Sequence, residues 1–345
     1  MQTNSQIKFS DRILKVGESP TFALEKKADA LDIELKKEGK SVIRFGIGQP
    51  DFNTPSNIKE AGKTAIDNNK TRYTPSTGIK ELKQAAADKF RKENQLEYGI
   101  ENILIGNGAK HILDDIMRAL VNPEDKVIIP RPYWVSYSQQ VILSEGIPLF
   151  VDFNQDLKID MEHFKEIVSA NDRIKLFILN SPNNPSGVVY SRQELQEIGE
   201  VCLNHGIIII ADEVYEKFLY GEARHFSMAG LSPELKASTI TLNAVSKTYA
   251  MTGWRIGYCA ADQQLISQMT KIHDQSTSNP CSIAQWAAVE ALQGDQDSVK
   301  QMRDEYEKEK TISIQGFLPW KKLDAPCPRR FLYLPRCFAA IWAGN

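Results

Sequence analysis

The sequence predicts an α/β fold, with a mainly parallel sheet flanked by helices, because two observations agree. Short apolar runs rich in β-branched residues alternate with helix-like segments through the middle of the chain. Polar residues follow several of these runs, and in parallel sheets ligands bind beyond the carboxyl ends of the strands. The expected strands cover residues 127–129, 176–179, 207–211 and 240–242, and residues 192–204 are an expected helix.

Composition and charge exclude several classes of protein. The 345-residue chain is 42% hydrophobic and can bury a large core, with room for a second, smaller domain. The net charge of -2 provides no basic field for nucleic acid. No apolar run is long enough to cross a bilayer and no leader pattern is visible, so we expect a cytoplasmic protein without a membrane partner. The five cysteines and five histidines show no metal-ligand spacing, so no metal is expected.

Two helix-like segments lie outside the predicted sheet. Residues 23–37 are amphipathic, and residues 299–310 are strongly charged.

Two glycine pairs, in FGIGQPDF and IGNGAKH, begin like a dinucleotide-binding fingerprint. Asp51 and His111 stand where the third glycine should be, so a nucleotide site is not expected.

The helix expected after the second glycine pair offers a candidate anion site. Apolar residues recur at helical spacing between positions 112 and 120. The amides of Gly108, Ala109 and Lys110 would be unpaired at its first turn, where the helix dipole also favours a phosphate. Taken alone, Lys110 would be read as a solvated lysine.

Polar residues follow two of the expected strands. Residues 181–187, SPNNPSG, are first of all a turn. Asp212 ends the run IIIIAD, and a carboxylate that emerges from a buried strand needs a cation or a donor as its partner. The same aspartate could equally cap the following turn. Tyr215, taken alone, would be an ordinary packed side chain.

The most informative segment is NAVSKTYAMTGWRIGY, residues 243–258. Residues 239–242 favour a strand, which places Lys247 just beyond a strand end. A lysine can form a Schiff base with an aldehyde, and the fork of Arg255 can bind a phosphate through two hydrogen bonds. Pyridoxal 5′-phosphate (PLP) offers both groups, so the pair indicates a PLP site.

These segments, in this order, resemble class I aminotransferases, the fold-type I PLP enzymes, and most closely the prokaryotic aspartate aminotransferases. The resemblance runs from about residue 45 to about residue 290. It implies a large PLP-binding domain over residues 48–290. Residues 1–47 would contribute to a smaller domain, and residues 291–345 would form an incomplete remainder of it.

The resemblance also implies a role for each candidate residue. Lys247 would hold the cofactor and move the substrate proton, Asp212 would face the ring nitrogen, and Tyr215 and Asn184 would bind the phenolic oxygen. Trp134 would stack on the ring and, with Gly48 and Asn184, contact the substrate. The residues expected at the phosphate are Gly108, Ala109, Lys110, Ser246 and Arg255, together with Tyr73 from the neighbouring subunit of a homodimer. The implied reaction moves an amino group from an amino acid, aspartate being the best guess, to a 2-oxo acid in a ping-pong cycle.

The chain departs from the family at two places. Some relatives carry a hydroxyl group where this chain has Ala244, so Ser246 and Arg255 would bind more of the phosphate. After about Glu309 the family's GAFYxF motif and its late carboxylate-binding arginine are missing. Codons permitted for residues 329–345, read one nucleotide later, can spell GAFYIFPDVSQLFGRE, so we interpret the tail as a frameshift or a sequencing error. Loss of a charged partner for the substrate costs roughly a hundredfold in rate, so weak or absent activity is expected.

Two alternatives remain open at this level. Another reaction on the same fold, such as that of a PLP-dependent lyase, would use the same cofactor residues. A catalytically dead PLP-binding protein would fit the missing tail.

Overall fold

The computed structural model describes residues 7–42, 44 and 48–317. Within these ranges the elements are, in chain order, α1 (Asp11–Leu14), α2 (Pro20–Lys36), α3 (Ser56–Asp67), α4 (Lys80–Lys89), the π-helix η1 (Phe90–Asn94), η2 (Ile100–Asn102), β1 (Ile103–Gly106), α5 (Ala109–Leu120), β2 (Lys126–Arg131), α6 (Ser136–Leu143), β3 (Ile147–Asp152), α7 (Met161–Ala170), β4 (Ile174–Asn180), α8 (Arg192–Asn204), β5 (Ile208–Asp212), η3 (Met228–Gly230), α9 (Pro233–Ala237), β6 (Thr239–Ala244), α10 (Val245–Thr248), η4 (Thr252–Trp254), β7 (Gly257–Ala260), α11 (Gln263–Ser276), α12 (Ser282–Gln293) and α13 (Asp297–Phe317).

A seven-stranded sheet forms the centre of the described chain, in the order β1-β7-β6-β5-β4-β2-β3. The strands from β6 to β3 are parallel, and β7 is antiparallel to both β6 and β1. The predicted α/β fold with a mainly parallel sheet is therefore confirmed. The four expected strands correspond to β2, β4, β5 and β6, whereas β1, β3 and β7 were not predicted.

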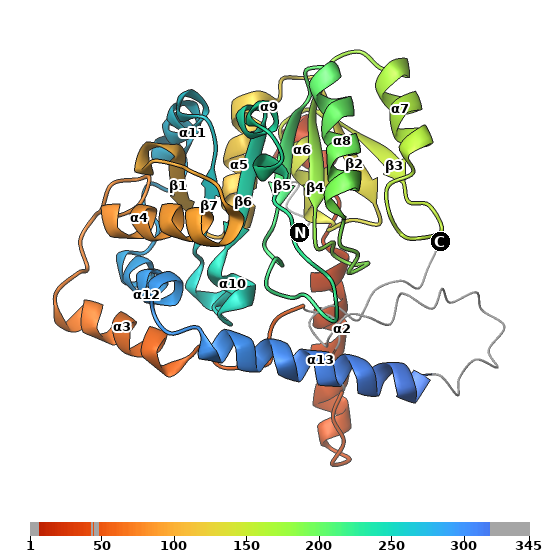
Figure 1. Cartoon of the computed structure of the whole chain (residues 1–345). Coiled ribbons are helices and arrows are strands. Elements are labelled where there is room, and N and C mark those ends of the chain that lie inside the picture. Colours follow the sequence, from red (N-terminus) through yellow and green to blue (C-terminus); the bar gives the residue numbers. More distant parts are fainter. Residues whose placement is uncertain (1–6, 43, 45–47, 318–345) are drawn as a thin grey trace.

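Helices cover both faces of this sheet (Figure 1). Side chains alternate along β2, so Val127 and Ile129 join the core formed with α5, α6 and α11, while Ile128 joins the core formed with α7, α8 and α9. Strands that are buried on both faces require continuous apolar runs, which is the pattern that the sequence showed.

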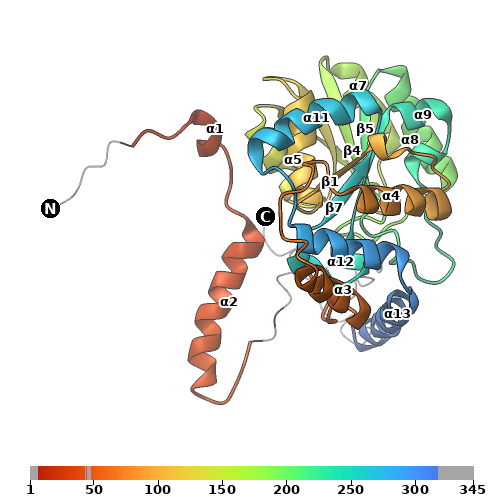
Figure 2. The ribbon, with the colours of Figure 1, turned by 90° about the vertical axis from the view of Figure 1, so that its left-hand side faces the viewer.

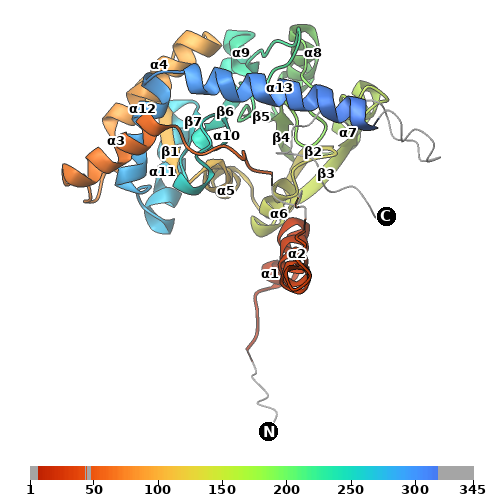
Figure 3. The ribbon, with the colours of Figure 1, turned by 90° about the horizontal axis from the view of Figure 1, so that it is seen from below.

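Other helices complete the body. α3, α4 and α12 pack over β1 and β7 in one apolar cluster. α13 crosses below the sheet in Figure 1, where Tyr306 packs edge-to-face on Phe52 and Phe218. Figures 2 and 3 show α2 standing off from the sheet, with Phe22 and Ile33 about two-thirds exposed, at 66% and 65%.

Some expectations are not tested by this arrangement. The predicted domain limits after residues 47 and 290 stay predictions. The interpretation of the tail as frameshifted concerns residues that lie, from 318 onward, outside the described ranges. None of the described helices combines the length and the apolar content needed to cross a membrane.

Candidate active site

Three neighbouring strands bring their carboxyl ends together at one edge of the sheet. Asn180, the last residue of β4, lies opposite Asp212, the last residue of β5, and Asp212 lies opposite Leu242 of β6. Parallel pairing therefore places the turn after β4, Asp212 and the short helix α10 with Lys247 side by side. The resemblance assigned roles to all three positions, and the sheet topology places their segments next to one another.

Asp212 is a buried carboxylate, with 3% of its surface exposed. Tyr137 Oη donates to its Oδ2 at 2.6 Å, and the main-chain N–H of Val214 donates to its Oδ1 at 3.2 Å. Burial raises the pKa of Asp212 to about 6, aided by the negative charge of Glu213, although the two hydrogen bonds act in the opposite direction. A positively charged partner would stabilise the ionised form of this side chain.

Tyr137 was missed in the sequence. It lies on α6, three residues after Trp134, and the two rings meet edge-to-face with centroids 5.4 Å apart. That spacing places both aromatic rings on the same side of the turn into α6, which is the signal that could have identified Tyr137. Burial, and then the neighbouring Asp212, raise the pKa of its hydroxyl, so Tyr137 remains a hydrogen-bond donor.

Asn184 and Tyr215 lie on the same side of the site. Asn184 Nδ2 donates to Tyr215 Oη at 3.4 Å, and the main-chain N–H of Asn184 donates to Asn180 Oδ1 at 2.6 Å. Tyr215 is 8% exposed. An amide N–H and a phenol O–H held together in this way can both donate to one oxyanion.

Lys247 extends from α10 towards the segment that follows residue 47. Its Nζ donates a hydrogen bond to the main-chain carbonyl of Gly48, so two residues that are 199 positions apart in the sequence lie in contact. Both residues are half-buried. The amine is therefore at the edge of the site, within reach of a ligand.

The first turn of α5 and Arg255 form the opposite end of the site. Arg255 has the left-handed backbone conformation, φ 58° and ψ 52°, which non-glycine residues adopt rarely and at a cost of about 1 kcal/mol or more. Its guanidinium lies on the turn before α5, where Nη2 donates to the carbonyl of Asn107 at 3.3 Å. A Cβ atom at Gly108, whose φ is +81°, would come within 2.3 Å of that Nη2. Only glycine leaves room for the arginine here.

β7 packs closely against the first residues of α5. A Cβ atom at Gly257, in β7, would lie 2.4 Å from the amide nitrogen of Ala109. On α5, Lys110 Nζ lies over the ring of Trp134, 5.0 Å from its centroid. Burial, and then the charge of Arg255, lower the pKa of Lys110, so the two cations oppose each other across the turn. An anion between them would relieve this repulsion.

The last two predicted residues differ in their placement. Ser246 is buried on α10, next to Lys247, and the N–H of Val245 donates to the carbonyl of Ile256 at 3.3 Å, which joins α10 to the Arg255 segment. Tyr73 is 95% exposed on the loop between α3 and α4. The structure gathers the other predicted residues at one edge of the sheet, and Tyr73 is not among them.

The side chains present fit PLP. A buried carboxylate that requires a positively charged partner suits the protonated ring nitrogen, and the Asn184–Tyr215 pair suits the phenolic oxygen. The first turn of α5, with Lys110 and Arg255, suits a phosphate dianion. The amine of Lys247 suits an aldehyde.

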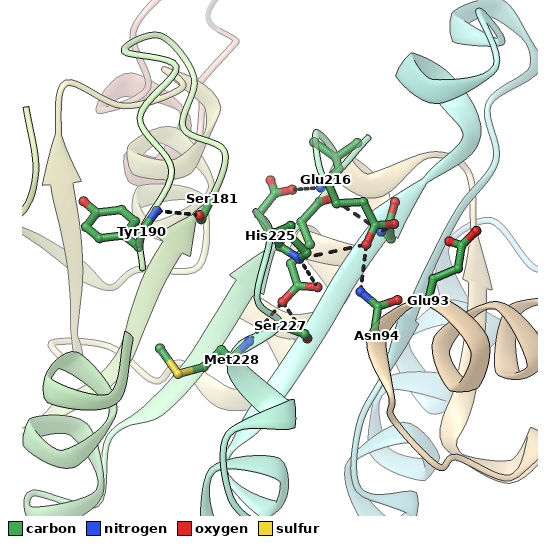
Figure 4. Close-up of polar contacts among 12 residues, drawn as sticks. Glu93, Asn94, Ser181, Tyr190, Glu216, His225, Ser227 and Met228 are labelled. Carbon is green, nitrogen blue, oxygen red and sulfur yellow. Dashed lines mark hydrogen bonds and ion pairs between the residues drawn. The ribbon is translucent and has the colours of Figure 1, made fainter. Parts of the chain in front are cut away.

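A buried polar network supports the loop that follows Asp212 (Figure 4). Glu213 Oε1 accepts hydrogen bonds from Ser227 Oγ at 2.8 Å and from the N–H of Met228 at 3.2 Å, and His225 Nε2 lies 3.1 Å from Glu213 Oε2. One carboxylate therefore ties both ends of the loop that contains Tyr215. No sequence pattern indicated this network.

Glu216 extends the network to distant parts of the chain. It pairs with Lys89 of α4 and accepts hydrogen bonds from Asn94 Nδ2 at 2.8 Å and Asn243 Nδ2 at 2.7 Å. Burial would raise the pKa of Glu216, but the charges of Lys89 and His225, together with hydrogen bonds from Lys89 and Asn94, outweigh burial and lower it to about 2. Glu216 therefore stays ionised while buried, because its partners satisfy it.

Comparison with known proteins identifies similar sequences and structures. Residues 40–321 match the family of class I and II aminotransferases. A protein of Bacillus sp. (strain YM-2) named aspartate aminotransferase is 45% identical over 316 residues, which cover 89% of this chain and 79% of that protein. A probable aspartate/prephenate aminotransferase of Aquifex aeolicus (strain VF5) is 40% identical over 335 residues, covering 96% of this chain and 84% of that protein. The solved structure of aspartate aminotransferase from Thermus thermophilus with maleate has a TM-score of 0.85 and 34% identity, covering 91% of this chain and 81% of that one.

Proposed function

Because this chain belongs to the family of class I and II aminotransferases, which depend on PLP, we propose that it moves an amino group between aspartate and a 2-oxo acid. The observation that carries the proposal is that β4, β5 and β6 are adjacent and parallel, because Asp212 ends β5 while Asn184 and Lys247 lie on the segments that follow β4 and β6. This arrangement supports a single site at which an amide, a carboxylate and an amine would act together.

Each group would act on a different part of the cofactor. When bound, PLP supplies an aldehyde that reacts with amines and a ring that withdraws electrons from the α-carbon of the attached amino acid. Asp212 would keep the ring nitrogen protonated, and that positive charge would in turn stabilise the buried carboxylate. Asn184 and Tyr215 would donate hydrogen bonds to the phenolic oxygen and favour its negative form. The α5 amides, Ser246 and the two cations would hold the phosphate.

Lys247 would have two roles. Its amine would bind the cofactor covalently until an amino acid replaces it, and the released amine would then carry the α-proton of the substrate from one carbon to another. The first half of the cycle releases a 2-oxo acid, and a second 2-oxo acid takes up the amino group in the other half. Gly48, which accepts a hydrogen bond from Lys247, would lie next to the substrate.

Aspartate as the donor is supported by the relatives. The Bacillus protein is named for aspartate, the Aquifex protein for aspartate or prephenate, and the Thermus structure was solved with maleate, a dicarboxylate. The cytoplasmic location expected from the sequence stays a prediction.

Covalent trapping tests the proposal. Borohydride reduction of the PLP-loaded protein, followed by peptide mass spectrometry, should find the pyridoxyl mass on Lys247. The label should disappear in Lys247→Ala and remain in Lys271→Ala, which changes an exposed lysine of α11. Turnover of aspartate with 2-oxoglutarate should fall by about a thousandfold or more in Lys247→Ala. A label elsewhere, or none, would refute the site.

Product analysis separates the remaining alternatives. An amino acid formed from the added 2-oxo acid indicates transfer, whereas loss of a substituent from the amino donor, without transfer, indicates a lyase. A cofactor spectrum that does not change on addition of aspartate indicates a protein that only binds PLP.

We also propose that the chain forms a homodimer in which Tyr73 reaches the phosphate site of the partner. The 95% exposure of Tyr73 supports this arrangement, because the aromatic ring covers no surface within its own chain.

A further inference from the structure

Asn107, which precedes Gly108, is held from three directions. Its carbonyl accepts a hydrogen bond from Arg255 Nη2 at 3.3 Å. Its main-chain N–H donates to His111 Nδ1 at 3.3 Å, and its side-chain Nδ2 donates to Thr277 Oγ1 at 3.1 Å. A contact that holds Asn107 in place therefore also holds the carbonyl that accepts the hydrogen bond from Arg255.

These contacts define one tautomer of His111. Because Nδ1 accepts from an N–H, the single ring hydrogen of the neutral imidazole is on Nε2. Nε2 faces Thr277 Oγ1 at 3.2 Å and Asp115 Oδ1 at 3.7 Å, and both oxygens can accept. Asn107, His111 and Thr277 thus form a closed set of mutual hydrogen bonds.

A fully buried pair of side chains, Asp115 and His273, lies next to His111. Asp115 and His273 are both 0% exposed, and His273 Nδ1 lies 2.8 Å from Asp115 Oδ2. The rings of His111 and His273 are 4.6 Å apart, so α5 and α11 are joined at this point. Among the described residues Asp115 Oδ1 has no hydrogen-bond partner, which leaves it able to attract the Nε2–H of His111.

His111, Asp115 and His273 also have possible ligand atoms within 4.8 Å of one another, a spacing that a metal ion could bridge. A metal on Nε2 of neutral His111 would move the ring hydrogen to Nδ1. That hydrogen would then face the N–H of Asn107, and two donors would oppose each other. The contacts of Asn107 therefore favour a hydrogen-bonding role for His111 over a metal site.

We propose that neutral His111 is a positioning residue for the cofactor phosphate: it holds Asn107, and through the Asn107 carbonyl it holds the guanidinium of Arg255 above the first turn of α5. This inference rests on the proposed function, since it assigns the phosphate to Arg255. His111 itself touches neither the cofactor nor the substrate.

The charges around His111 set its response to pH. Burial lowers its pKa below the ordinary 6.5, and His273 on α11 and Arg118 on α5 act in the same direction, while Asp115 and Asp114 on α5 oppose them. Arg118 and Asp114 pair with each other at 2.8 Å. His111 therefore stays neutral at neutral pH. Once it is protonated in acid, Nδ1–H would face the N–H of Asn107 and release the turn.

The test compares ligands with and without a phosphate. The affinity of the cofactor-free protein for PLP and for pyridoxal would be measured in wild type, in His111→Leu and in His111→Gln, whose amide oxygen can replace Nδ1 as an acceptor. His163→Leu is the matched control, because His163 Nδ1 also accepts from a main-chain N–H, that of Asp152 at 3.2 Å, on β3. Thermal unfolding of each variant checks that it folds.

We expect His111→Leu to weaken PLP binding about tenfold, roughly the value of one hydrogen bond, and to leave pyridoxal binding unchanged. His111→Gln should recover most of the loss. In acid, wild type should lose PLP affinity more steeply than His111→Gln, because only the histidine can be protonated. If His111→Leu binds PLP as tightly as His163→Leu does, or weakens both ligands equally, the inference is wrong. Wild type that does not distinguish PLP from pyridoxal, and takes up no label at Lys247, would instead refute the proposed function.

Discussion

Asp212 illustrates how a single residue can be costly for the fold and useful for the reaction. Its carboxylate is buried with two hydrogen-bond donors, Tyr137 and the N–H of Val214, and no cation compensates its charge in the contacts described. A buried carboxylate with a raised pKa is typical of functional positions. The cofactor nitrogen would supply the missing positive charge.

For Asp212→Asn we expect a flatter pH dependence of the free energy of unfolding of the cofactor-free protein. The folded pKa of about 6 lies above the ordinary 3.8, so the folded chain binds the proton more tightly. The stability that this provides is present below pH 3.8 and is lost as the pH rises through about 6. The difference of about two units corresponds to about 3 kcal/mol.

Urea unfolding at about pH 4 and about pH 7 measures this effect. Asparagine can keep both hydrogen bonds, with Oδ1 accepting from Val214 and Nδ2 donating to Tyr137. Wild type and variant that lose the same stability between the two pH values would show that Asp212 does not carry the difference.

At the level of elements, the contact between β7, the turn before α5 and Arg255 leaves no spare volume. Gly257 lies against the amide of Ala109, and Gly108 lies against the guanidinium. The phosphate end of the site is thus built from main chain held at close distance, with glycine at both contacts.

Gly108→Ala should weaken PLP binding by about tenfold or more, because the added Cβ would displace the guanidinium of Arg255. Gly206→Ala is the matched control: Gly206 also has a positive φ, +64°, but a Cβ atom added there would meet no atom within 4 Å. Both variants should also lose stability to backbone strain, and Gly108→Ala should lose more, because φ 81° with ψ 164° is a conformation that essentially only glycine adopts. Equal PLP affinities, measured by fluorescence titration, would contradict the steric argument.

Elements with a strong periodic pattern could be predicted from the sequence, and elements defined by partners could not. The apolar runs of β2, β4, β5 and β6 and the amphipathic face of α5 are local signals. β1 and β7 are four residues long, and they are strands because of their partners: β1 pairs with β7, and β7 also pairs with β6. The position of Lys247 after a strand indicated its chemistry, whereas Asp212 fitted a capping role equally well and received its expected role from the family resemblance. Tyr137 was recognised through its contact with Asp212.

At the scale of the whole molecule, the proposed homodimer makes a direct prediction. If Tyr73 acts across the interface, a mixture of Tyr73→Phe and Lys247→Ala chains contains mixed dimers with one site that has both native residues. Mixing two weak variants should therefore restore PLP affinity at that site. Sedimentation confirms the dimer, and titration measures the gain. A gain of zero in a verified mixed dimer would place Tyr73 outside the partner's site.

The network around Glu216 determines where two related chains can be joined to give a chimera that folds. Lys89 and Asn94 come from an early part of the chain, whereas Glu216, His225 and Asn243 come from a late part, and all five meet in the interior. A chimera with its crossover anywhere between residues 94 and 216 inherits the two halves from different parents. Such hybrids should fold well only when both parents carry the same charges at these positions, so the productive junctions lie before Lys89 or after Asn243.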